Sequence, residues 1–298
     1  MSIIIINYNQ VQLTIDCIES LISSGADLSQ IIIIDNASED KSAEILNTYF
    51  GPTITIHELS ENKGYPHGLN VGISIAVKKG ADWFLLMNND VIVDEIFLPE
   101  LQKAINENPS AKLIGPAILY YDQPKIVWYL GYKIIPGTLI GVRSFRGRKY
   151  NEKIPKYVSI DVMHGCTMLV HKIVFDQIGL FDDSDIIYGD DADFSLRARN
   201  AGFLMIGASR AKIWHRISAT MGKEKPQTRY LRTRNTIAFY NRYSKGISKY
   251  IMLIFTLLKT FVTLIKDIIM HREHLILPLC NGFIDGWRLQ KDTLSKSK

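Results

Sequence analysis

Two short runs of isoleucine near the start of the chain restrict its fold most strongly. Residues 3–6 and residues 31–34 consist entirely of isoleucine. A strand that is apolar at every position is typical of a parallel sheet covered by helices on both faces. Further strand-like segments follow at residues 53–57 and 83–87, and apolar residues at helical spacing lie between the segments. The first ~120 residues therefore predict strand–helix repeats and an α/β fold with a mostly parallel sheet.

The helices of this region carry recognisable start signals. Ser38 follows the second strand and is expected to be the N-cap of the next helix. Pro66 suits the first turn of another helix, because that turn does not need its missing N–H group. Behind Pro66, an apolar stripe at helical spacing is expected to face the core, formed by Leu69, Ile73, Ala76 and Val77.

The middle of the chain is less regular. Residues 113–161 mix glycine, proline and aromatic residues and predict only short β segments. Residues 143–156 are basic and polar, and they are interpreted as either a mobile loop or an inert surface loop. A strand at residues 167–171 and helices at residues 190–201 and 229–243 are expected to follow.

The last fifty or so residues have a different character. Residues 250–269 are largely apolar but contain Lys259, Lys266 and Asp267, so they form a poor transmembrane span. The two lysines are seven residues apart and share one helix face, which leaves a broad apolar face opposite. We expect a helix that lies in a membrane interface; the alternatives are packing on the domain core or on a second copy in a homodimer. The expected domains are 1–245, divided into halves of about 1–120 and about 121–245, and a helical region at 246–298.

Charge and cysteine content limit the classes of function. The net charge is +5, and basic residues, Lys223 among them, gather between positions 197 and 242. Three interpretations are open: these residues form a solvated face, contact a diphosphate, or attract the chain to anionic lipid. No recognised nucleic-acid-binding module is present, so we expect no nucleic acid partner. Three scattered cysteines and the lack of a signal-peptide pattern predict a reduced, cytoplasmic setting.

Carboxylates follow two of the expected strands. Asp35 comes directly after residues 31–34, and Asp90 comes shortly after residues 83–87. In open α/β sheets, ligands bind beyond the carboxyl ends of the strands. Asp35 suits a hydrogen bond to the base or ribose of a nucleotide, and Asp90 suits a divalent cation on its diphosphate. Each aspartate alone could equally be a cap or turn residue.

A second acidic cluster lies at residues 190–193, which contain Asp190, Asp191 and Asp193. Carboxylates at the start of a helix are favoured by the helix dipole, which is one explanation of their position. Crowding also raises the pKa of one carboxyl group, which suits a general base. Trp128 has a flat aromatic face that could stack on a ligand, although a place in the hydrophobic core is the commoner role for a tryptophan.

The order of these motifs resembles one family along roughly residues 1–245. The chain is similar to family-2 inverting glycosyltransferases with the GT-A fold, and within them to the bacterial rhamnosyltransferase-like branch. The resemblance implies a Rossmann-like mixed sheet flanked by helices, with a C-terminal amphipathic helical extension. The segments that carry it are residues 5–9, 34–42, 61–72, 87–90, 164–169, 178–182, 188–193 (with Tyr188), 214–215 and 230–235.

The resemblance implies a role for each matching residue. Asp191 matches the catalytic base, and Asp90 and His215 match positions that hold a divalent cation, Mg²⁺ or Mn²⁺. The expected donor-binding residues are Asn7, Asn9, Asp35, Asn36, Asn62, Gly64, Asn70, Asn88, Asn89 and Arg234. On the acceptor side the expected residues are Trp128, Gly165 and Asp190.

Two residues depart from the family pattern. Asn88 stands where the metal motif has its first aspartate, so one anionic ligand is missing. Asp190 stands where a glutamate usually precedes the base, and its side chain is one methylene shorter. The first change puts the strength of cation binding in doubt, and the second changes the reach toward an acceptor.

The implied activity is transfer of a sugar from a dTDP- or UDP-sugar to a hydroxyl of a lipid-linked or cell-surface glycan, with inversion and Asp191 as base. Rhamnose is the favoured sugar; galactofuranose, N-acetylglucosamine and other hexoses are alternatives. The expected location is cytoplasmic, peripheral at the inner face of the cell membrane. Other classes are a nucleotidyltransferase, which would need a glycine- and lysine-rich loop near residues 5–10, and a non-catalytic homologue that binds sugar or a partner.

Overall fold

The computed structural model of the 298-residue chain describes residues 1–183, 189–216 and 225–289. Tyr188 of the acidic motif and Lys223 of the basic stretch lie outside the described residues. The chain forms two compact units. The first, called the sheet unit below, comprises Met1–Lys133, Arg143–Ile186 and Asp190–Thr220. The second, called the helical unit, comprises Ile134–Val142, Ile187–Gly189 and Met221–Lys298.

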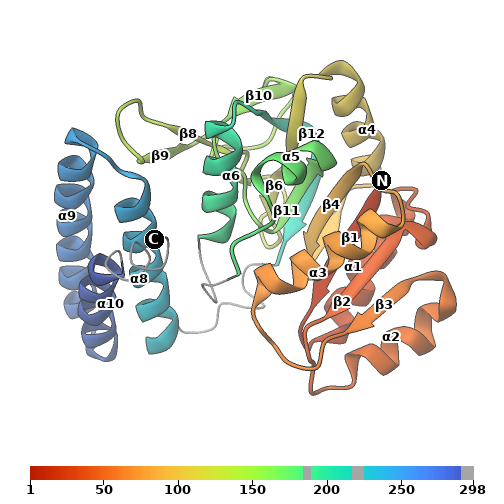
Figure 1. Cartoon of the computed structure of the whole chain (residues 1–298), viewed down its shortest axis with the longest axis horizontal. Helices are drawn as coiled ribbons and strands as arrows, with labels where there is room; N and C mark the ends of the chain where they lie inside the picture. The colour runs from red at the N-terminus through yellow and green to blue at the C-terminus, as the bar shows by residue number, and fades with distance from the viewer. Residues whose placement is uncertain (184–188, 217–224, 290–298) are drawn as a thin grey trace. The chain divides into compact units, whose positions relative to one another are not determined.

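The sheet unit is built on one large mixed sheet, in which the strands run in the order β10-β12-β6-β11-β4-β1-β2-β3 (Figure 1). Strands β4, β1, β2 and β3 are parallel, and β11 joins the group antiparallel to β4. β5 and β7 pair with β12 and β6, and β8 and β9 form a separate pair. The strands are β1 Ser2–Asn7, β2 Ile31–Asp35, β3 Thr55–Glu58, β4 Trp83–Asn88, β5 Val91–Val93, β6 Ala111–Tyr120, β7 Val127–Tyr129, β8 Tyr132–Ile134, β9 Gly141–Arg143, β10 Tyr157–Ile160, β11 Thr167–His171 and β12 Leu204–His215.

Helices cover both faces of this sheet, as the isoleucine runs predict. Ile3 and Ile5 of β1 pack in one apolar cluster, and Ile4 and Ile6 pack in another, because successive side chains of a strand point to opposite faces. The first cluster includes residues of α1, α2 and α4, and the second includes residues of α3, α5 and α6. These helices are α1 Val11–Ser23, α2 Ser42–Phe50, α3 Tyr65–Lys78, α4 Phe97–Glu107, α5 Lys172–Ile178 and α6 Asp190–Asn200; short 3₁₀ turns are η1 Leu28–Gln30 and η2 Gly51–Thr53.

Three details of the sequence interpretation are wrong. Helix α2 begins at Ser42, so Ser38 is not its N-cap. Val77 is 41% exposed, so it lies outside the buried stripe of α3. The region expected to hold only short β segments contains β6, a ten-residue strand with Pro116 in its interior. The register between β6 and β12 shifts between Ala208 and Lys212, opposite Pro116, because a bulge accommodates a residue that cannot donate to the ladder.

The described residues of the helical unit form three helices, which are labelled in Figure 1. They are α8 Pro226–Tyr243, α9 Ile247–Ile269 and α10 Ile276–Arg288, with η3 Glu273–Leu275 before α10. A Cβ atom at Gly282 would lie 2.6 Å from the carbonyl oxygen of Tyr230, so the glycine allows α10 to pack closely on α8. Helix α8 falls within the expected domain 1–245 but groups with the C-terminal helices; the boundary at residue 245 stays a prediction.

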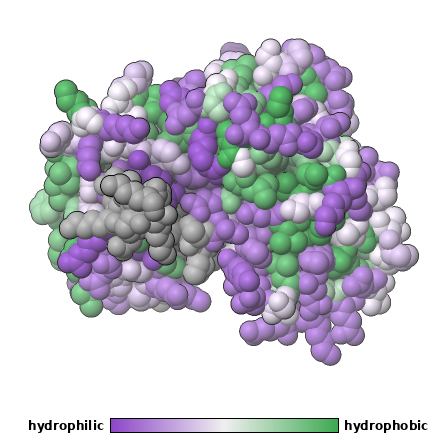
Figure 2. Space-filling view, in the orientation of Figure 1, coloured by the Kyte–Doolittle hydropathy of each residue, from purple (hydrophilic) through white to green (hydrophobic). Residues whose placement is uncertain are grey.

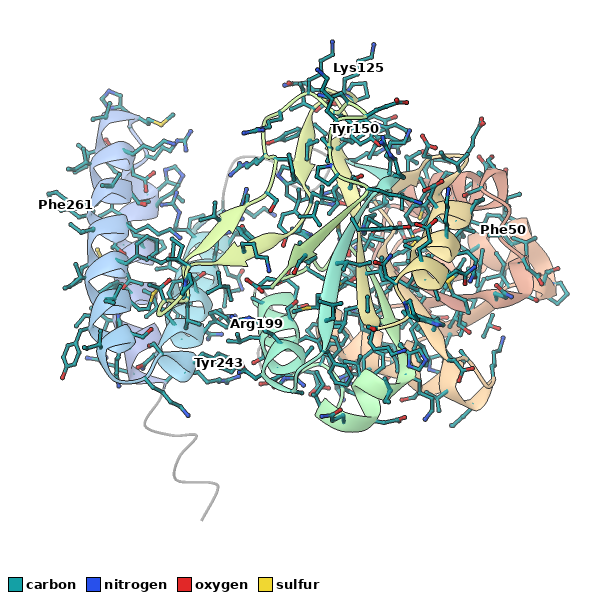
Figure 3. The ribbon with its side chains drawn as sticks, turned by 90° about the horizontal axis from the view of Figure 1, so that it is seen from above. Phe50, Lys125, Tyr150, Arg199, Tyr243 and Phe261 are labelled. Carbon is teal, nitrogen blue, oxygen red and sulfur yellow. The ribbon has the colours of Figure 1, made fainter. Side chains whose placement is uncertain are left out.

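Helix α9 has two contrasting faces. Thr256 and Asp267 are buried against the rest of the unit. The opposite face is exposed and mostly apolar, and Figure 2 shows hydrophobic side chains along α9 at the left edge of the view. Figure 3 shows Phe261 on the side of α9 that faces away from α8. Within the described residues, no helix combines the length and the hydrophobicity needed to cross a bilayer.

Candidate active site

The carboxyl ends of the central parallel strands bring polar residues to one edge of the sheet. In the register of the strands, Asn7 is opposite Asp35, and Ile6 is opposite Asn88. The last residues of β1, β2 and β4 therefore lie side by side. Ligands of open α/β sheets bind at this edge, so the edge is the candidate active site.

A buried carboxylate, Asp35, anchors this edge. It is fully buried, and one of its oxygens accepts hydrogen bonds from Asn7 Nδ2 at 2.6 Å and Ser38 Oγ at 2.7 Å. Its other oxygen accepts the backbone N–H of Ser38 at 2.8 Å. The donors compensate the loss of water around the buried carboxylate. The sequence assigned Asp35 and Asn7 to this site and assigned Ser38 to a helix cap.

Ser38 ties together the two loops that border the carboxylate. Its hydroxyl oxygen accepts the backbone N–H of Asn9 at 2.8 Å. Asn9 has a left-handed backbone with φ +56°, and its side-chain oxygen accepts the N–H of Glu39 at 2.9 Å. The spacing Asp35 to Ser38 is typical of a carboxylate that bonds its own chain a few residues ahead, a signal that could have identified this role.

A second set of asparagines continues the site. Asn36 donates from Nδ2 to Asn62 Oδ1 at 2.9 Å, and the N–H of Gly64 donates to the same oxygen at 2.9 Å. Gly64 has φ +98°, a conformation that favours glycine, and it precedes α3. Asn36 Oδ1 is buried and has no hydrogen-bond partner within the described residues. A buried acceptor without a partner suits an N–H or O–H group of a ligand.

Asn88 and Asn89 behave differently although they are neighbours. Asn89 Nδ2 donates to Thr14 Oγ1 at 3.0 Å and to Asn7 Oδ1 at 3.3 Å, so it belongs to the network around Asp35. Thr14, in α1, also donates to Asn7 Oδ1 at 2.5 Å, a contact that the sequence did not suggest. The side chain of Asn88 makes no hydrogen bond to the residues that the structure describes.

The candidate cation ligands Asp90 and His215 are brought together. His215 is the last residue of β12, which pairs with β5 so that His215 is opposite Val91. Its Nε2 atom lies 3.1 Å from Asp90 Oδ1, and both side chains are about nine-tenths buried. His215 Nδ1 is buried without a partner among the described residues. The described part of the chain contains no cluster of three or more His, Cys, Asp or Glu side chains suited to a metal.

An aromatic cluster lies beside the candidate cation ligand His215 and includes His164, which precedes Gly165. The ring of Trp128 lies 5.1 Å from the ring of His215 and 4.6 Å from that of His164, measured between centroids. Burial lowers the pKa of His164 to about 4, so this ring is neutral at pH 7. His164 Nδ1 accepts the N–H of Cys166 at 3.1 Å, which fixes the turn that contains Gly165. His164 begins one of the segments that carry the family resemblance, but the sequence gives it no role in the site.

The carboxylates of the acidic motif are held at the start of α6. The N–H of Gly165 donates to Asp191 Oδ2 at 2.9 Å, and the N–H of Ala192 donates to Asp191 Oδ1 at 2.8 Å. Tyr65, the first residue of α3, donates from its hydroxyl to the carbonyl of Gly165 at 3.0 Å. Burial, and next the charge of Asp191, raise the pKa of Asp190 to about 7. Asp190 therefore carries a proton for part of the time near neutral pH, while Asp191 is held by two N–H donors.

Two expected donor-binding residues have other surroundings. Asn70 donates to the carbonyl of Phe181 at 2.9 Å and accepts its N–H at 3.1 Å, so this side chain holds the segment that leads to α6. Arg234 lies in α8 of the helical unit, where Nε donates to Asn235 Oδ1 at 2.8 Å and the guanidinium lies over the ring of Tyr230. Donor contacts from these two residues stay predictions.

Curated relatives of the chain are glycosyltransferases. The low-salt glycan biosynthesis hexosyltransferase of Haloferax volcanii is 25% identical over 208 residues, which cover 67% of this chain and 61% of that protein. The dTDP-rhamnosyl transferase of Shigella flexneri is 25% identical over 219 residues, covering 69% and 68%. The N-acetylglucosaminyl-diphospho-decaprenol L-rhamnosyltransferase of Mycobacterium tuberculosis is 22% identical over 217 residues, covering 65% and 68%.

Solved structures confirm the expected fold class. GalNAc-T7, crystallised with UDP, GalNAc and Mn²⁺, superposes with a TM-score of 0.59 at 15% identity. The match covers 80% of this chain and 46% of that one. S. aureus TarS in complex with UDP superposes with a TM-score of 0.53 at 14% identity, covering 84% of this chain and 67% of TarS.

The match to a protein-family model agrees with the motifs and the fold. The model of glycosyl transferase family 2 matches residues 2–179. This stretch includes β1, β2, β4 and the turn of Gly165, which carry most of the candidate site. The chain therefore belongs to glycosyl transferase family 2.

Proposed function

We propose that the protein is an inverting glycosyltransferase that moves a sugar from a nucleoside-diphosphate donor to a hydroxyl group of a lipid-linked or cell-surface glycan. Rhamnose is the favoured sugar, since two relatives carry rhamnosyl transfer in their names. Other hexoses are the alternative, which the hexosyltransferase of Haloferax volcanii keeps open. The observation that carries the proposal is the Asp191 carboxylate, held by the Gly165 N–H in the same unit as the buried Asp35 network.

The donor nucleotide, dTDP or UDP, is assigned to the edge formed by β1 and β2. Asp35 and the asparagines around it provide acceptors for the ribose and the base. The buried Asn36 Oδ1 atom, which has no partner among the described residues, suits an N–H group of a pyrimidine base or a ribose hydroxyl. Gly64, at φ +98°, lets the backbone approach the diphosphate closely.

A divalent cation, Mg²⁺ or Mn²⁺, fits the pair Asp90 and His215. His215 Nε2 and Asp90 Oδ1 lie 3.1 Å apart and both side chains are about nine-tenths buried, so a cation held between them would take one nitrogen and one oxygen ligand. With Asn88 in place of an aspartate, the remaining ligands have to come from the diphosphate and water, an arrangement that Mg²⁺ commonly adopts. The cation would neutralise the charge that develops on the departing nucleoside diphosphate.

Asp191 acts as the general base in this mechanism. Its carboxylate takes the proton of the acceptor hydroxyl while the hydroxyl oxygen attacks the anomeric carbon of the donor sugar. The new C–O bond forms on the face opposite the bond to the diphosphate, which breaks and leaves with its electron pair. One displacement therefore inverts the configuration. The Gly165 N–H holds Asp191 in place, and Trp128 offers an aromatic face for the acceptor sugar.

The acceptor is assigned to the membrane surface at the inner face of the cell membrane. The exposed face of α9 is apolar along the helix, as in helices that lie in a membrane interface. The mycobacterial relative is named for an acceptor that carries a diphosphate and a lipid. An enzyme bound to the membrane by α9 would meet acceptors of this class where they are anchored.

A donor panel with an Asp191→Asn variant tests the proposal. Wild type is incubated with dTDP- and UDP-sugars and a lipid-linked acceptor fraction, with and without Mn²⁺ or Mg²⁺, and transfer and nucleotide binding are measured. We expect cation-dependent transfer from one donor, and about a 10²–10⁴-fold loss in Asp191→Asn with nucleotide binding retained.

Asp176→Asn is the matched control, because Asp176 is an exposed carboxylate of α5 that pairs with Lys172. It should transfer sugar at the wild-type rate. Transfer by Asp191→Asn at the wild-type rate would contradict the assigned base, and a wild type that binds no nucleotide sugar would contradict the proposed function as a whole.

A further inference from the structure

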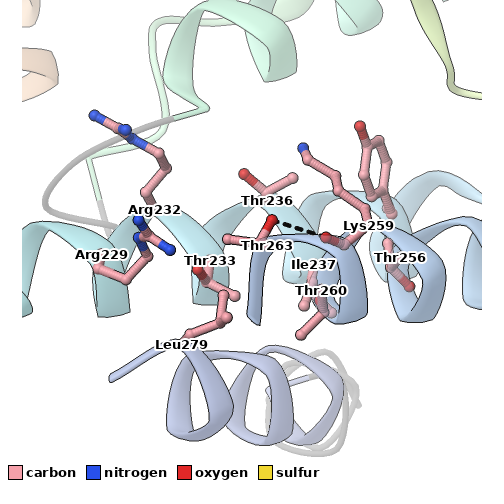
Figure 4. Close-up of a pocket in the computed structure, with 11 residues that line it drawn as sticks. Arg229, Arg232, Thr233, Thr236, Ile237, Thr256, Lys259, Thr260, Thr263 and Leu279 are labelled. Atoms are coloured by element: carbon pink, nitrogen blue, oxygen red, sulfur yellow. Dashed lines mark hydrogen bonds between the residues drawn. The ribbon is translucent and has the colours of Figure 1, made fainter. Parts of the chain in front are cut away.

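The helical unit contains a cavity that is open to solvent on one side and has chemistry of its own. It has a volume of about 240 Å³ and lies among α8, α9 and α10 (Figure 4). A water molecule takes up about 30 Å³ of the liquid, so the cavity has room for a larger polar group. Its lining includes Arg229, Arg232 and Lys259 and a series of threonines. The proposed transfer reaction uses none of these residues.

The lining is cationic. Among the described residues, it contains three basic side chains and no carboxylate. Arg229 is fixed by Asp267, with Nη1 2.6 Å from Oδ2, and both side chains are buried. Figure 4 shows Arg232 and Lys259 extending to the same side of the α8 and α9 helices, away from α10. Cations that converge on one cavity favour an anionic ligand.

Hydroxyl groups add hydrogen-bond donors to this charge. Thr256 and Thr263 donate to backbone carbonyls of their own helix. The hydroxyls of Thr233, Thr236 and Thr260 also line the cavity and make no hydrogen bond within the described residues. Guanidinium, ammonium and hydroxyl donors around one space suit the several acceptor oxygens of a phosphate group.

The opposite side of α9 indicates where such a phosphate group would come from. Thr256 and Asp267 face the interior, while the outward face exposes apolar residues along the helix. A helix is about 10 Å across, and an interfacial helix sinks its apolar face about 5–10 Å into the boundary between headgroups and acyl chains. The inner side of α9 would then lie at the level of lipid phosphates. The exposed apolar face runs from Ile247 to Ile269 and includes Ile254, Leu258, Phe261 and Ile265.

We propose that this cavity binds the diphosphate group of a membrane-anchored, lipid-linked acceptor. The inference rests on the proposed function, which places the acceptor at the membrane, and it adds the chemical group of the acceptor that is bound and the residues that bind it. Arg232 and Lys259 bind the phosphate oxygens, the threonine hydroxyls complete the contacts, and the lipid chain remains in the bilayer.

Binding of the full chain to vesicles tests this site. The probe is a phosphatidylcholine vesicle that carries a long-chain polyprenyl diphosphate, compared with plain phosphatidylcholine. The double variant Arg232→Gln/Lys259→Gln should weaken binding to the diphosphate vesicles by about a hundredfold, tenfold for each charge-assisted hydrogen bond. Binding to plain vesicles should stay the same, because it depends on the apolar face of α9. Retention of the diphosphate preference by this variant would overturn the proposal.

Two controls separate the site from general charge and from misfolding. Lys266→Gln removes the same charge from the exposed part of α9 outside the cavity lining, and it should change binding by less than about twofold. Arg232→Lys/Lys259→Arg keeps both charges and should retain most of the diphosphate preference. Arg229 is left intact, because its removal would strand the buried Asp267.

Other sources of phosphate give different results. On phosphatidylglycerol vesicles, Arg232→Gln/Lys259→Gln should weaken binding no more than the removal of two exposed lysines elsewhere on the protein. A hundredfold weakening on these vesicles would overturn the assignment to a lipid diphosphate, because it would show that the cavity binds any anionic lipid. Excess inorganic pyrophosphate should reduce wild-type binding to diphosphate vesicles to the level of the double variant. Failure to compete would also overturn the proposal.

The readouts distinguish this inference from the proposed function. Vesicle binding needs no turnover, so a protein without transferase activity can still show the diphosphate preference. In the converse outcome, transfer depends on Asp191 but wild type binds diphosphate vesicles and plain vesicles equally well. This outcome would contradict the cavity assignment and leave the proposed function intact.

Discussion

The sheet unit and the helical unit place polar and apolar residues in opposite ways. In the sheet unit, Ile3 and Ile33 are fully buried, and the functional polar residues gather at the strand ends. In the helical unit, the charged pair Arg229 and Asp267 is buried, while Phe261 and its neighbours on α9 are exposed. The first arrangement is usual for a protein in water. The second supports the proposed contact of α9 with an apolar surrounding.

The difference also separates the sources of stability in the two units. Burial of aliphatic side chains on both faces of the sheet stabilises the sheet unit by about 25 cal/mol per Å² of apolar surface. The interior of the helical unit depends more on matched polar groups and on close helix packing at glycine. We therefore expect the two units to respond differently to similar substitutions.

The largest effect on stability is expected from breaking the buried ion pair of the helical unit. Asp267→Ala leaves the Arg229 guanidinium buried without its carboxylate and should cost about 3–5 kcal/mol of unfolding free energy. Replacing both residues, as Arg229→Leu/Asp267→Leu, should restore most of this loss. Hydrogen exchange of α8–α10 amides during urea unfolding measures both effects.

The exposed ion pair of the sheet unit provides the contrast. Asp176→Ala breaks the pair with Lys172 on α5 and should cost at most about 0.5 kcal/mol. Equal costs for Asp176→Ala and Asp267→Ala would contradict the distinction drawn between the two units.

The pH dependence of the sheet unit should report on Asp190. Burial and the charge of Asp191 raise its pKa to about 7 from an ordinary value of 3.8. The folded state therefore holds this proton to higher pH than the unfolded state. The contribution of this proton to the unfolding free energy is fully present below the pKa that Asp190 has in the unfolded state, and it is lost as the pH rises through about 7. From about pH 5 to about pH 8, wild type should lose about 2–3 kcal/mol more than Asp190→Asn.

Denaturant unfolding without divalent cations measures this difference. Asp193→Asn is unsuitable as a control because Asp193 pairs with Arg197, so the exposed Asp176→Asn is used instead. Asp176→Asn should follow the wild-type pH profile, and the same profile for Asp190→Asn would show that Asp190 does not hold the proton.

A smaller effect is expected from methyl groups added to helical glycines. In Gly282→Ala, the new Cβ would lie 2.6 Å from a backbone oxygen of α8, so α10 must move, at a cost of about 1–3 kcal/mol. In Gly68→Ala on α3, the nearest atom is a methyl group of Ile6 at 3.4 Å. The gain in helix propensity, up to about 1 kcal/mol, should offset that contact. Thermal unfolding of the two variants compares them, and a destabilisation of equal size would contradict the argument.

Much of the sheet unit could be predicted from the sequence because its signals are local. The isoleucine runs identify β1 and β2, and polar residues directly after each strand identify the edge where Asn7 and Asp35 meet. β6 was missed because Gly115 and Pro116 interrupt its strand pattern, and only the bulge of the partner strand makes the proline acceptable. The sequence predicts Ser38 as a helix N-cap because a cap and a turn that binds Asp35 have the same local composition.

The cavity of the helical unit could not be predicted, because its parts meet only in the folded chain. Arg229 and Asp267 are 38 residues apart, and Asp267 reads in the sequence as an interruption of an apolar helix. The role of His164 could not be predicted either, because its neutral ring results from burial beside Trp128 and not from any pattern of adjacent residues.

The smallest effect on stability is expected on the exposed face of α9. Ile254 and Phe261 are 58% and 59% exposed, so Ile254→Ser/Phe261→Ser should change the unfolding free energy by less than about 1 kcal/mol. Ile33→Ser, in the core of the sheet unit, should cost about 2–5 kcal/mol. The α9 variant should nevertheless bind plain phosphatidylcholine vesicles at least about tenfold more weakly, because each buried apolar side chain contributes about 1.5–3 kcal/mol. Sedimentation of wild type and variant without lipid tests the alternative: a dimer that dissociates in the variant, with vesicle binding unchanged, would assign this face to a second copy of the chain.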